Sequence, residues 1–323
     1  MPLIAACRRP LIAALVALSV TSGVAHGAEW RNARSTQIPV DGGLVEVNVH
    51  AGRYSVSAES INDWVTRSAH AVSTYLGRFP VELLRLEIRS EAGDDVGFGM
   101  AYGHDHHIEV DLGHRANANA LMTDWVLVHE MLHMGHPDVG DRHKWFKEGL
   151  ATYVEPIARA QIGNRTAQQV WNGFRTQLPQ GQPQPGDRGL DFTPTWGRIY
   201  WGGALYFFVS DIAIRQQTGN RKGLQDALRA ILRAGGTLDR DWSIQKTLAI
   251  GDAATGTTVL QDQYQRMRAR PVRVDLERIW QQLGVSPEAA PGPQVDEKAP
   301  LATLRTAILT PPDPPVKTGG APD

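Results

Sequence analysis

The sequence predicts an α+β fold, in which a small mixed β-sheet is followed by a mostly helical part. Residues 45–49, 84–88 and 108–112 each alternate apolar with polar side chains, as half-buried strands do. After residue 115, apolar side chains recur every three or four residues instead, which is typical of amphipathic helices. We therefore expect an N-terminal α+β subdomain at 28–115 and a helical subdomain at 116–285.

Residues 1–27 have the features of an export signal peptide. Arg8 and Arg9 precede a short apolar stretch at 11–20, and the small residues Ala25 and Gly27 offer a cleavage site before Ala28. That stretch is shorter than the roughly 20 apolar residues that a membrane-spanning helix needs. We expect an exported protein, periplasmic or secreted, with no stable membrane insertion after cleavage. An uncleaved anchor and twin-arginine export remain as alternatives.

Composition excludes several classes of protein. The chain has 323 residues with 33 Lys and Arg against 34 Asp and Glu, so it lacks the basic excess that binding to nucleic acid requires. Nucleic acid is therefore not an expected partner. The single cysteine, Cys7, lies in the leader. The mature chain is thus expected to have no disulfide, no iron–sulfur cluster and no catalytic thiol.

Helices are expected on both sides of the third predicted strand. Trp64 and Tyr75 lie at helical spacing, with Gly77 as a stop signal, and a glycine-rich stretch at 97–103 leads into the strand. One later helix is expected to bury a stripe of four apolar side chains and to end near 135–137. The stripe consists of Leu121, Trp125, Val128 and Leu132.

A further helix should begin after Asp141, with Pro156 kinking or ending it. Others are expected at 166–178, 197–218, 221–234, 258–269 and 274–283. The proline-rich segment 179–194 predicts a surface loop. Residues 286–323 are rich in proline and poor in aromatic residues, which predicts a disordered tail.

The strongest chemical signal is the H-E-x-x-H pattern formed by His129, Glu130 and His133. Histidines four residues apart on a helix point the same way, which lets both imidazoles reach one Zn²⁺ ion. Glu130 is then placed as a general base for the attacking water. The alternative is a chance match, since eight of the eleven histidines lie between residues 104 and 143.

A catalytic zinc ion needs a third protein ligand. The position six residues past His133, where the metzincin pattern has histidine, is Val139. His136 sits where the helix is expected to end and is predicted to lie at the rim. The remaining candidate is Glu148, which antiparallel packing of two helices would bring over the histidine pair. The neighbouring Gly149, in mid-helix, indicates a close approach of another helix or of the metal.

With these residues, the sequence resembles the gluzincin metallopeptidases, in particular their aminopeptidase and glycyl-aminopeptidase group. His129-Glu130-x-x-His133 is followed by Trp145-x-x-Glu148-Gly149-Leu150-Ala151, and Tyr200-x-x-Gly203 is similar to the family's Tyr-x-Lys-Gly motif. The resemblance covers about residues 60 to 285. It implies a thermolysin-like metallopeptidase catalytic domain with one Zn²⁺ per chain. It also implies Glu148 as the third ligand and Tyr200 as the donor to the oxyanion.

The departures from the family concern how a substrate is held. The segment 98–102 resembles the family's Gly-Ala-Met-Glu-Asn strand, but Ala101 stands where the amine-binding glutamate belongs, and Gly202 replaces the lysine. This favours an endopeptidase over a strict aminopeptidase. The polar residues at 104–107 could supply another lining of the site or form an exposed turn. Thr152 and Asp211 are candidate partners for the ligating histidines.

Together these patterns predict an exported zinc-dependent peptidase that acts on peptide or protein substrates. The alternative is a gluzincin-fold protein of the cell envelope that is catalytically silent or acts on a non-peptide amide.

Overall fold

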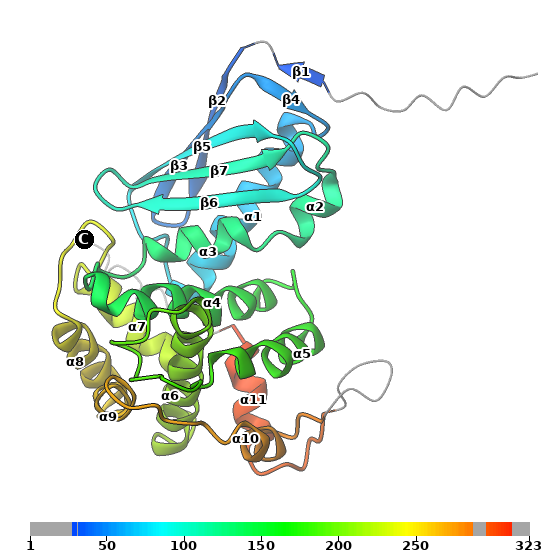
Figure 1. The fold of residues 1–323 in the computed structure, drawn as a ribbon. Helices are drawn as coiled ribbons and strands as arrows, with labels where there is room; N and C mark the ends of the chain where they lie inside the picture. The colour runs from blue at the N-terminus through cyan, green and yellow to red at the C-terminus, as the bar shows by residue number, and fades with distance from the viewer. Residues whose placement is uncertain (1–27, 31, 287–294, 312–323) are drawn as a thin grey trace, which may run out of the picture.

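The computed structural model describes residues 28–30, 32–286 and 295–311. The expected leader at 1–27 lies outside the described residues, as do 287–294 and 312–323 of the expected tail. The architecture is α+β, as predicted, with a five-stranded sheet at one end of the molecule and helices at the other (Figure 1). No helix in the described part of the chain is long and apolar enough to cross a membrane.

The sheet is mixed, with strand order β2-β3-β5-β7-β6. Its strands are β2 (Arg34–Val40), β3 (Gly43–Val49), β5 (Leu83–Glu91), β6 (Val96–Tyr102) and β7 (His107–Gly113). β3, β5 and β7 run parallel and contain the three predicted strands, while β2 and β6 pair antiparallel at the two edges. The short strands β1 (Ala28–Trp30) and β4 (Gly52–Tyr54) form a separate pair. The glycine-rich stretch is therefore itself an edge strand.

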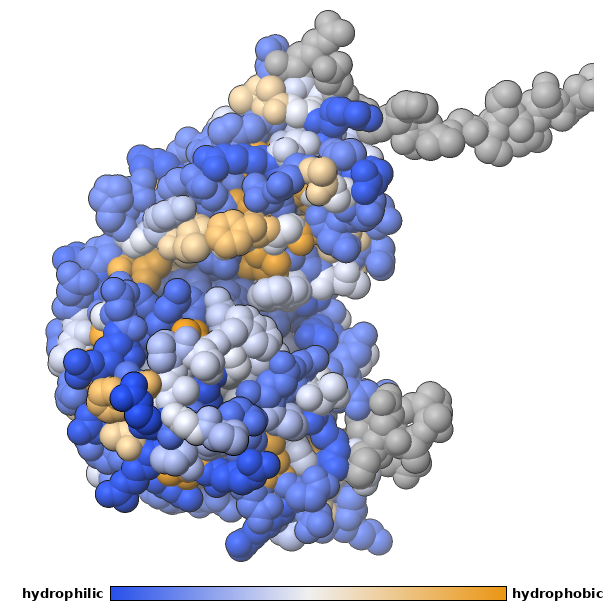
Figure 2. All heavy atoms as spheres, viewed as in Figure 1, coloured by the Kyte–Doolittle hydropathy of each residue, from blue (hydrophilic) through white to orange (hydrophobic). Residues whose placement is uncertain are grey.

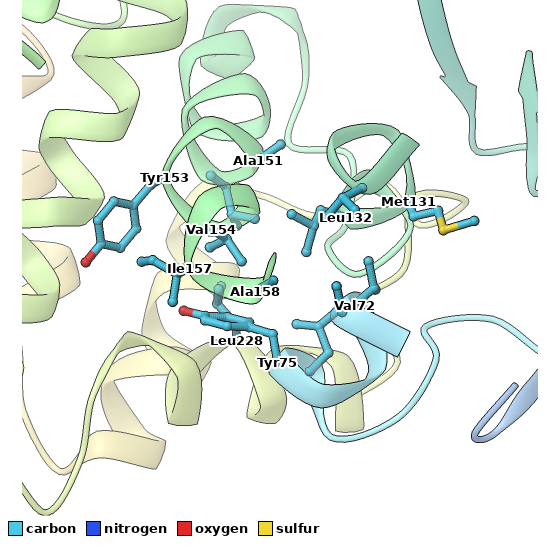
Figure 3. Packing of buried hydrophobic residues seen from close by; sticks show 14 of the residues in the cluster. Val72, Tyr75, Met131, Leu132, Ala151, Tyr153, Val154, Ile157, Ala158 and Leu228 are labelled. Atoms are coloured by element: carbon cyan, nitrogen blue, oxygen red, sulfur yellow. The ribbon is translucent and has the colours of Figure 1, made fainter. Parts of the chain in front are cut away.

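The crossover helix α1 (Ala58–Leu76) connects β4 to β5 and packs beneath the sheet (Figure 1). Ser57 caps its first turn by accepting a hydrogen bond from the backbone N–H of Ser60, and Gly77 ends it in the left-handed conformation. Its apolar face meets helices from the other half of the molecule. Figure 3 shows Val72, Leu132 and Val154 at this junction, all completely buried. This packing makes the sheet and the helices share one core.

The expected single helix through Leu121 and Leu132 is wrong. The chain forms two helices instead, α2 (Ala118–Thr123) and α3 (Val126–His133), and Asp124 lies between them. The Asp124 carboxylate accepts hydrogen bonds from the backbone N–H groups of Val126 and Leu127 and from Trp64 Nε1. This carboxylate competes with continued helical bonding and starts α3 at a new angle. As a result Trp125, expected in the buried stripe, is 53% exposed.

Helix α4 (Lys144–Gln161) continues through Pro156. The sequence predicted either a kink or the end of the helix at this proline, and the helix does not end there. It follows a 3₁₀ turn, η1 (Asp141–His143), and packs against the π-helical turn η3 (Arg198–Gly202) and α6 (Gly203–Gln217). A Cβ on Gly149 would lie 2.3 Å from the Cα of Gly203. The two backbones touch, as the mid-helix glycine predicted.

Two helices correct the sequence-based expectations. α8 (Ile244–Thr255) was not expected, and α11 (Ala302–Leu309) lies within the predicted disordered tail. α11 is ordered because Ile308 is buried and the Arg305 guanidinium donates to the carbonyl of Leu283 at 2.7 Å. The other helices are α5 (Ala167–Gln177), α7 (Leu224–Arg233), α9 (Val259–Met267) and α10 (Leu276–Leu283).

The expected surface loop at 179–194 is packed against the helices. It begins in the 3₁₀ turn η2 (Leu178–Gly181). Asp187 forms a buried ion pair with Arg198 of η3 at 2.8 Å, and Asp191 accepts a hydrogen bond from Trp145 Nε1 at 2.9 Å. These contacts tie the loop to the beginning of α4 and to η3, the two elements that carry Glu148 and Tyr200.

Candidate metal centre

Helix α3 presents His129, Glu130 and His133 between the sheet and the helices. All three are buried, with 3%, 9% and 7% of their surface exposed. One helical turn separates the two histidines, so both imidazoles project from the same face. Nε2 of His129 lies 3.3 Å from a carboxylate oxygen of Glu148, and Nε2 of His133 lies 3.5 Å from the same oxygen.

The loop between α3 and α4 brings Glu148 to this position. Lys147, next to Glu148, pairs with Asp138 of that loop at 3.2 Å and so helps to orient the first turns of α4. The three donor atoms of His129, His133 and Glu148 all lie within 4.8 Å of one another. The structure thus brings together the three residues that the sequence singled out as metal ligands.

This donor set fits a zinc ion. Two imidazole nitrogens and one carboxylate oxygen form a common three-ligand set of catalytic zinc sites, which leaves a fourth position open. Burial raises the pKa of Glu148, but hydrogen bonds from His129 and His133 outweigh it and hold that pKa well below its usual range. Glu148 is therefore an anion at neutral pH, as a ligand of a cation must be.

His136 is fully buried, not at the rim as the sequence predicted. Its Nε2 lies 3.2 Å from Nδ1 of His133, and its own Nδ1 lies 3.0 Å from the carbonyl oxygen of Pro137. It is thus a direct neighbour of a candidate ligand, on the side away from Glu148. The helix ends as expected, but Phe146 of α4 packs against the ring of His136, with the two ring centroids 6.1 Å apart.

Glu130 lies against the edge strand β6. A Cβ on Gly99 would lie 2.8 Å from Cγ of Glu130 and 2.6 Å from Val126. Only glycine allows the strand to approach α3 so closely. Ala101 is two residues further along β6 and therefore lies on the same face of the strand as Gly99. A carboxylate at position 101 would face the helices, and the methyl group present there has no charge to offer.

Tyr200 lies at the centre of the π-helical turn, and such turns occur often at functional sites. Its ring centroid is 6.3 Å from that of His129 and 5.8 Å from that of Trp196, and both pairs are stacked. Burial, together with the negative charges of Glu148 and Glu130, raises the pKa of Tyr200 to about 12. The hydroxyl therefore keeps its proton and remains a hydrogen-bond donor beside Glu148. It is not part of the aromatic core formed by Tyr206 and Phe208.

Comparison with solved structures relates the fold of this chain to known proteins. The chain is similar to an aminopeptidase N family protein from Idiomarina loihiensis, with a TM-score of 0.62 and 12% identity over 78% of this chain and 49% of that one. The two share a fold. A zinc metallopeptidase from Deinococcus radiodurans, described as M1, is also similar, with a TM-score of 0.48 and 16% identity over 75% of this chain and 53% of that one. The chain thus spans about half the length of these proteins. No family model and no curated protein matches the sequence.

Asp211 and Thr152, the two expected partners of the ligating histidines, lie in different surroundings in this structure. Asp211 accepts hydrogen bonds from Tyr153 and Arg215 at 3.0 and 2.9 Å and contacts neither histidine, so that expectation is wrong. Thr152 lies on the wall of a cavity beside His129. Residues 103–106 form a turn, in which His106 pairs with Asp239 at 3.3 Å.

Sequence reasoning missed Glu155, which is buried on the same cavity wall as His129. It follows Glu148 by seven residues, two helical turns, so a search for acidic side chains on one face of α4 would have found it. Its carboxylate pairs with Arg159 at 2.8 Å, and burial raises its pKa.

Proposed function

We propose that this protein is a zinc-dependent peptidase. The observation that supports this most directly is the convergence of His129, His133 and Glu148 with Glu130 beside them. A zinc ion bound by the first three residues would supply Lewis-acid polarisation of the scissile carbonyl and would lower the pKa of a water molecule. The gluzincin pattern of these residues and the shared fold support the same assignment.

Glu130 acts as general base in this proposal. Its carboxylate takes a proton from the attacking water and later delivers it to the leaving nitrogen. Tyr200 donates its hydroxyl proton in a hydrogen bond to the oxygen of the scissile carbonyl as negative charge develops there. The raised pKa of Tyr200 keeps that donor protonated at neutral pH.

The substrate lies along β6 in extended form. β6 is an edge strand, so one side of its backbone has no neighbour in the sheet. Phe98, Met100 and Tyr102 alternate with Gly99 and Ala101, so they lie on the face of β6 that points away from Glu130, and they are 63%, 39% and 43% exposed. Figure 2 shows apolar side chains on this border of the sheet, above a hollow. Ala101 offers no carboxylate for a free amino terminus, which supports an endopeptidase over a strict aminopeptidase.

We also propose that the protein is exported. The support is the pattern of charged, apolar and small residues at 1–27.

The test is hydrolysis of a mixed peptide library by the zinc-loaded mature chain, in matched forms with free and with blocked amino termini. The Glu130→Gln variant serves as the inactive control. Cleavage of blocked peptides by the native chain, but not by the Glu130→Gln variant, supports an endopeptidase. Cleavage confined to free peptides contradicts the inference from Ala101, and no cleavage in either set contradicts the peptidase proposal.

A further inference from the structure

A cavity of about 730 Å³ adjoins the metal centre, since both His129 and Tyr200 line it. Its other walls come from α4, α5 and the segment 196–201. This volume is of the size that holds a small ligand or a few residues of a peptide. A substrate whose scissile bond lies at the metal centre therefore extends into this cavity on one side.

Three charged side chains line the cavity, and two of them neutralise each other. Glu155 and Arg159 form a buried ion pair at 2.8 Å. The Arg159 guanidinium also donates to Asn164 at 2.7 Å and to the carbonyl of Thr123 at 3.1 Å. Arg159 is thus fully engaged, and its charge is balanced.

Arg165, in the connection between α4 and α5, is the third charged side chain. It is half-buried, and its guanidinium makes no hydrogen bond and no ion pair within 4.0 Å to any residue that the structure describes. Burial, the largest cause, lowers its pKa, while the negative charge of Glu155 raises it and the positive charge of Arg159 lowers it. Glu155 balances one of the two guanidinium groups, so the cavity carries one excess positive charge, and Arg165 is the cation that has no direct hydrogen-bonded contact among the described residues.

Aromatic side chains also line the cavity, together with polar ones such as Gln169 and Gln177. Trp125 and Trp196 are 53% and 59% exposed, which is unusual for side chains of this size. Trp201 also lines the cavity, and its indole N–H is buried without a hydrogen-bond partner among the described residues. The cavity thus combines aromatic surface with one cation that makes no ion pair and one donor without a partner among the described residues. These features match a ligand that is apolar next to a carboxylate.

We propose that this cavity is a substrate subsite in which Arg165 binds a carboxylate group of the peptide while the tryptophans hold the apolar part beside it. The proposal rests on the peptidase function above and names the substrate class. The carboxylate has two possible sources, the carboxy terminus of a short peptide or an acidic side chain within a longer one. Both supply the two oxygens that a guanidinium binds in parallel.

Binding is measured by quenching of tryptophan fluorescence in the zinc-loaded Glu130→Gln chain, so that no turnover is needed. N-acetyl-phenylalanine is compared with its amide for the terminal source. N-acetyl-glutamic acid α-amide is compared with N-acetyl-glutamine amide for the side-chain source. In at least one pair, the acid binds about 10- to 100-fold more tightly than the amide, as expected for a charge-assisted hydrogen-bonded pair.

Adding Arg165→Gln removes this preference, whereas Arg53→Gln, the same charge change on exposed β4, preserves it. Arg165→Lys keeps the charge without the parallel geometry and gives an intermediate preference. Equal affinity for acid and amide in both pairs overturns the proposal. So does a preference that survives Arg165→Gln, because the carboxylate would then be bound elsewhere, for example by the metal.

The same acid and amide pairs, lengthened so that each peptide contains the scissile bond, are then tested as substrates of the native chain. Arg165→Gln raises KM for the acid about 10- to 100-fold and leaves kcat within a few-fold, since the contact is remote from the reacting atoms. A failure of the peptidase proposal appears as no turnover with the binding preference intact. A failure of the subsite appears as turnover without any preference for the acid.

Discussion

Nδ1 of His133 lies 3.2 Å from Nε2 of His136, whose Nδ1 lies 3.0 Å from the carbonyl oxygen of Pro137. A carbonyl only accepts, so Nδ1 of His136 carries a proton. Burial, followed by the nearby charge of His133, lowers the pKa of His136 to about 3, so its Nε2 is bare at neutral pH. Nδ1 of His133 must then be the donor. The Nε2 proton that His133 donates to Glu148 is then the one that zinc displaces, so that the lone pair of Nε2 can bind the metal.

Replacing His136 by leucine should lower zinc affinity by about 10- to 100-fold, because the ring of His133 loses the partner that sets its tautomer. His136→Gln, which keeps an acceptor, should lose less. Zinc affinity is measured by competition with a chelator, with His70→Ala on the exposed face of α1 as control. Equal affinity for the leucine variant and the native chain would contradict this chain of hydrogen bonds.

Glu148→Ala should remove most of the bound zinc, since the site then keeps only two protein ligands. The expected loss of affinity is several orders of magnitude, measured as zinc per chain after dialysis. Glu82→Ala, at an exposed position, should retain one zinc per chain. Full zinc content in the Glu148 variant would mean that another residue is the third ligand.

Gly149→Ala should destabilise the fold by about 1–3 kcal/mol or more, because overpacking forces neighbouring elements apart. The new Cβ would lie 2.3 Å from Gly203 and would separate α4 from α6. Gly173→Ala, in the middle of α5, meets no atom within 4 Å. That variant should instead gain about 0.5–1 kcal/mol from the lower entropy of its unfolded chain. Urea unfolding of both variants measures the difference, and similar midpoints would refute the contact.

Tyr75→Phe should make the protein more resistant to alkaline unfolding. Burial, the largest cause, raises the pKa of Tyr75 well above 10, while the unfolded chain titrates near 10. The folded state holds the proton longer, so this contribution to stability is complete below pH 10 and is lost as pH rises above it. The native chain should lose about 1.4 kcal/mol more per pH unit than the variant above pH 10. Urea midpoints at pH 9 and pH 11 test this, and parallel declines would count against it.

Residues whose roles depend on local spacing could be predicted from the sequence. His129, Glu130 and His133 share a helical face because four residues make about one turn. Gly149 was expected at a close approach and lies against Gly203. The strands were found because alternation marks a half-buried strand whatever its neighbours are.

Features that depend on competing local bonds were missed. Asp124 divides the expected helix because its carboxylate reaches the N–H groups of Val126 and Leu127, and a stripe of apolar residues gives no sign of that competition.

A helix that depends on contacts outside its own segment could not be predicted either. The composition of residues 302–309 predicts a disordered tail. Their helix is stabilised by contacts such as that of Arg305 with Leu283, which is distant in sequence.

The sequence by itself determined the chemistry of the candidate centre, because the identity and helical spacing of His129, Glu130 and His133 suffice to specify two imidazoles and a base on one surface. Only the tertiary structure decided what surrounds them. It encloses His136 behind His133, brings β6 onto Glu130 and leaves Arg165 without an ion pair among the described residues beside the same cavity. These relationships arise from packing between elements far apart in the chain, and no local pattern encodes that packing.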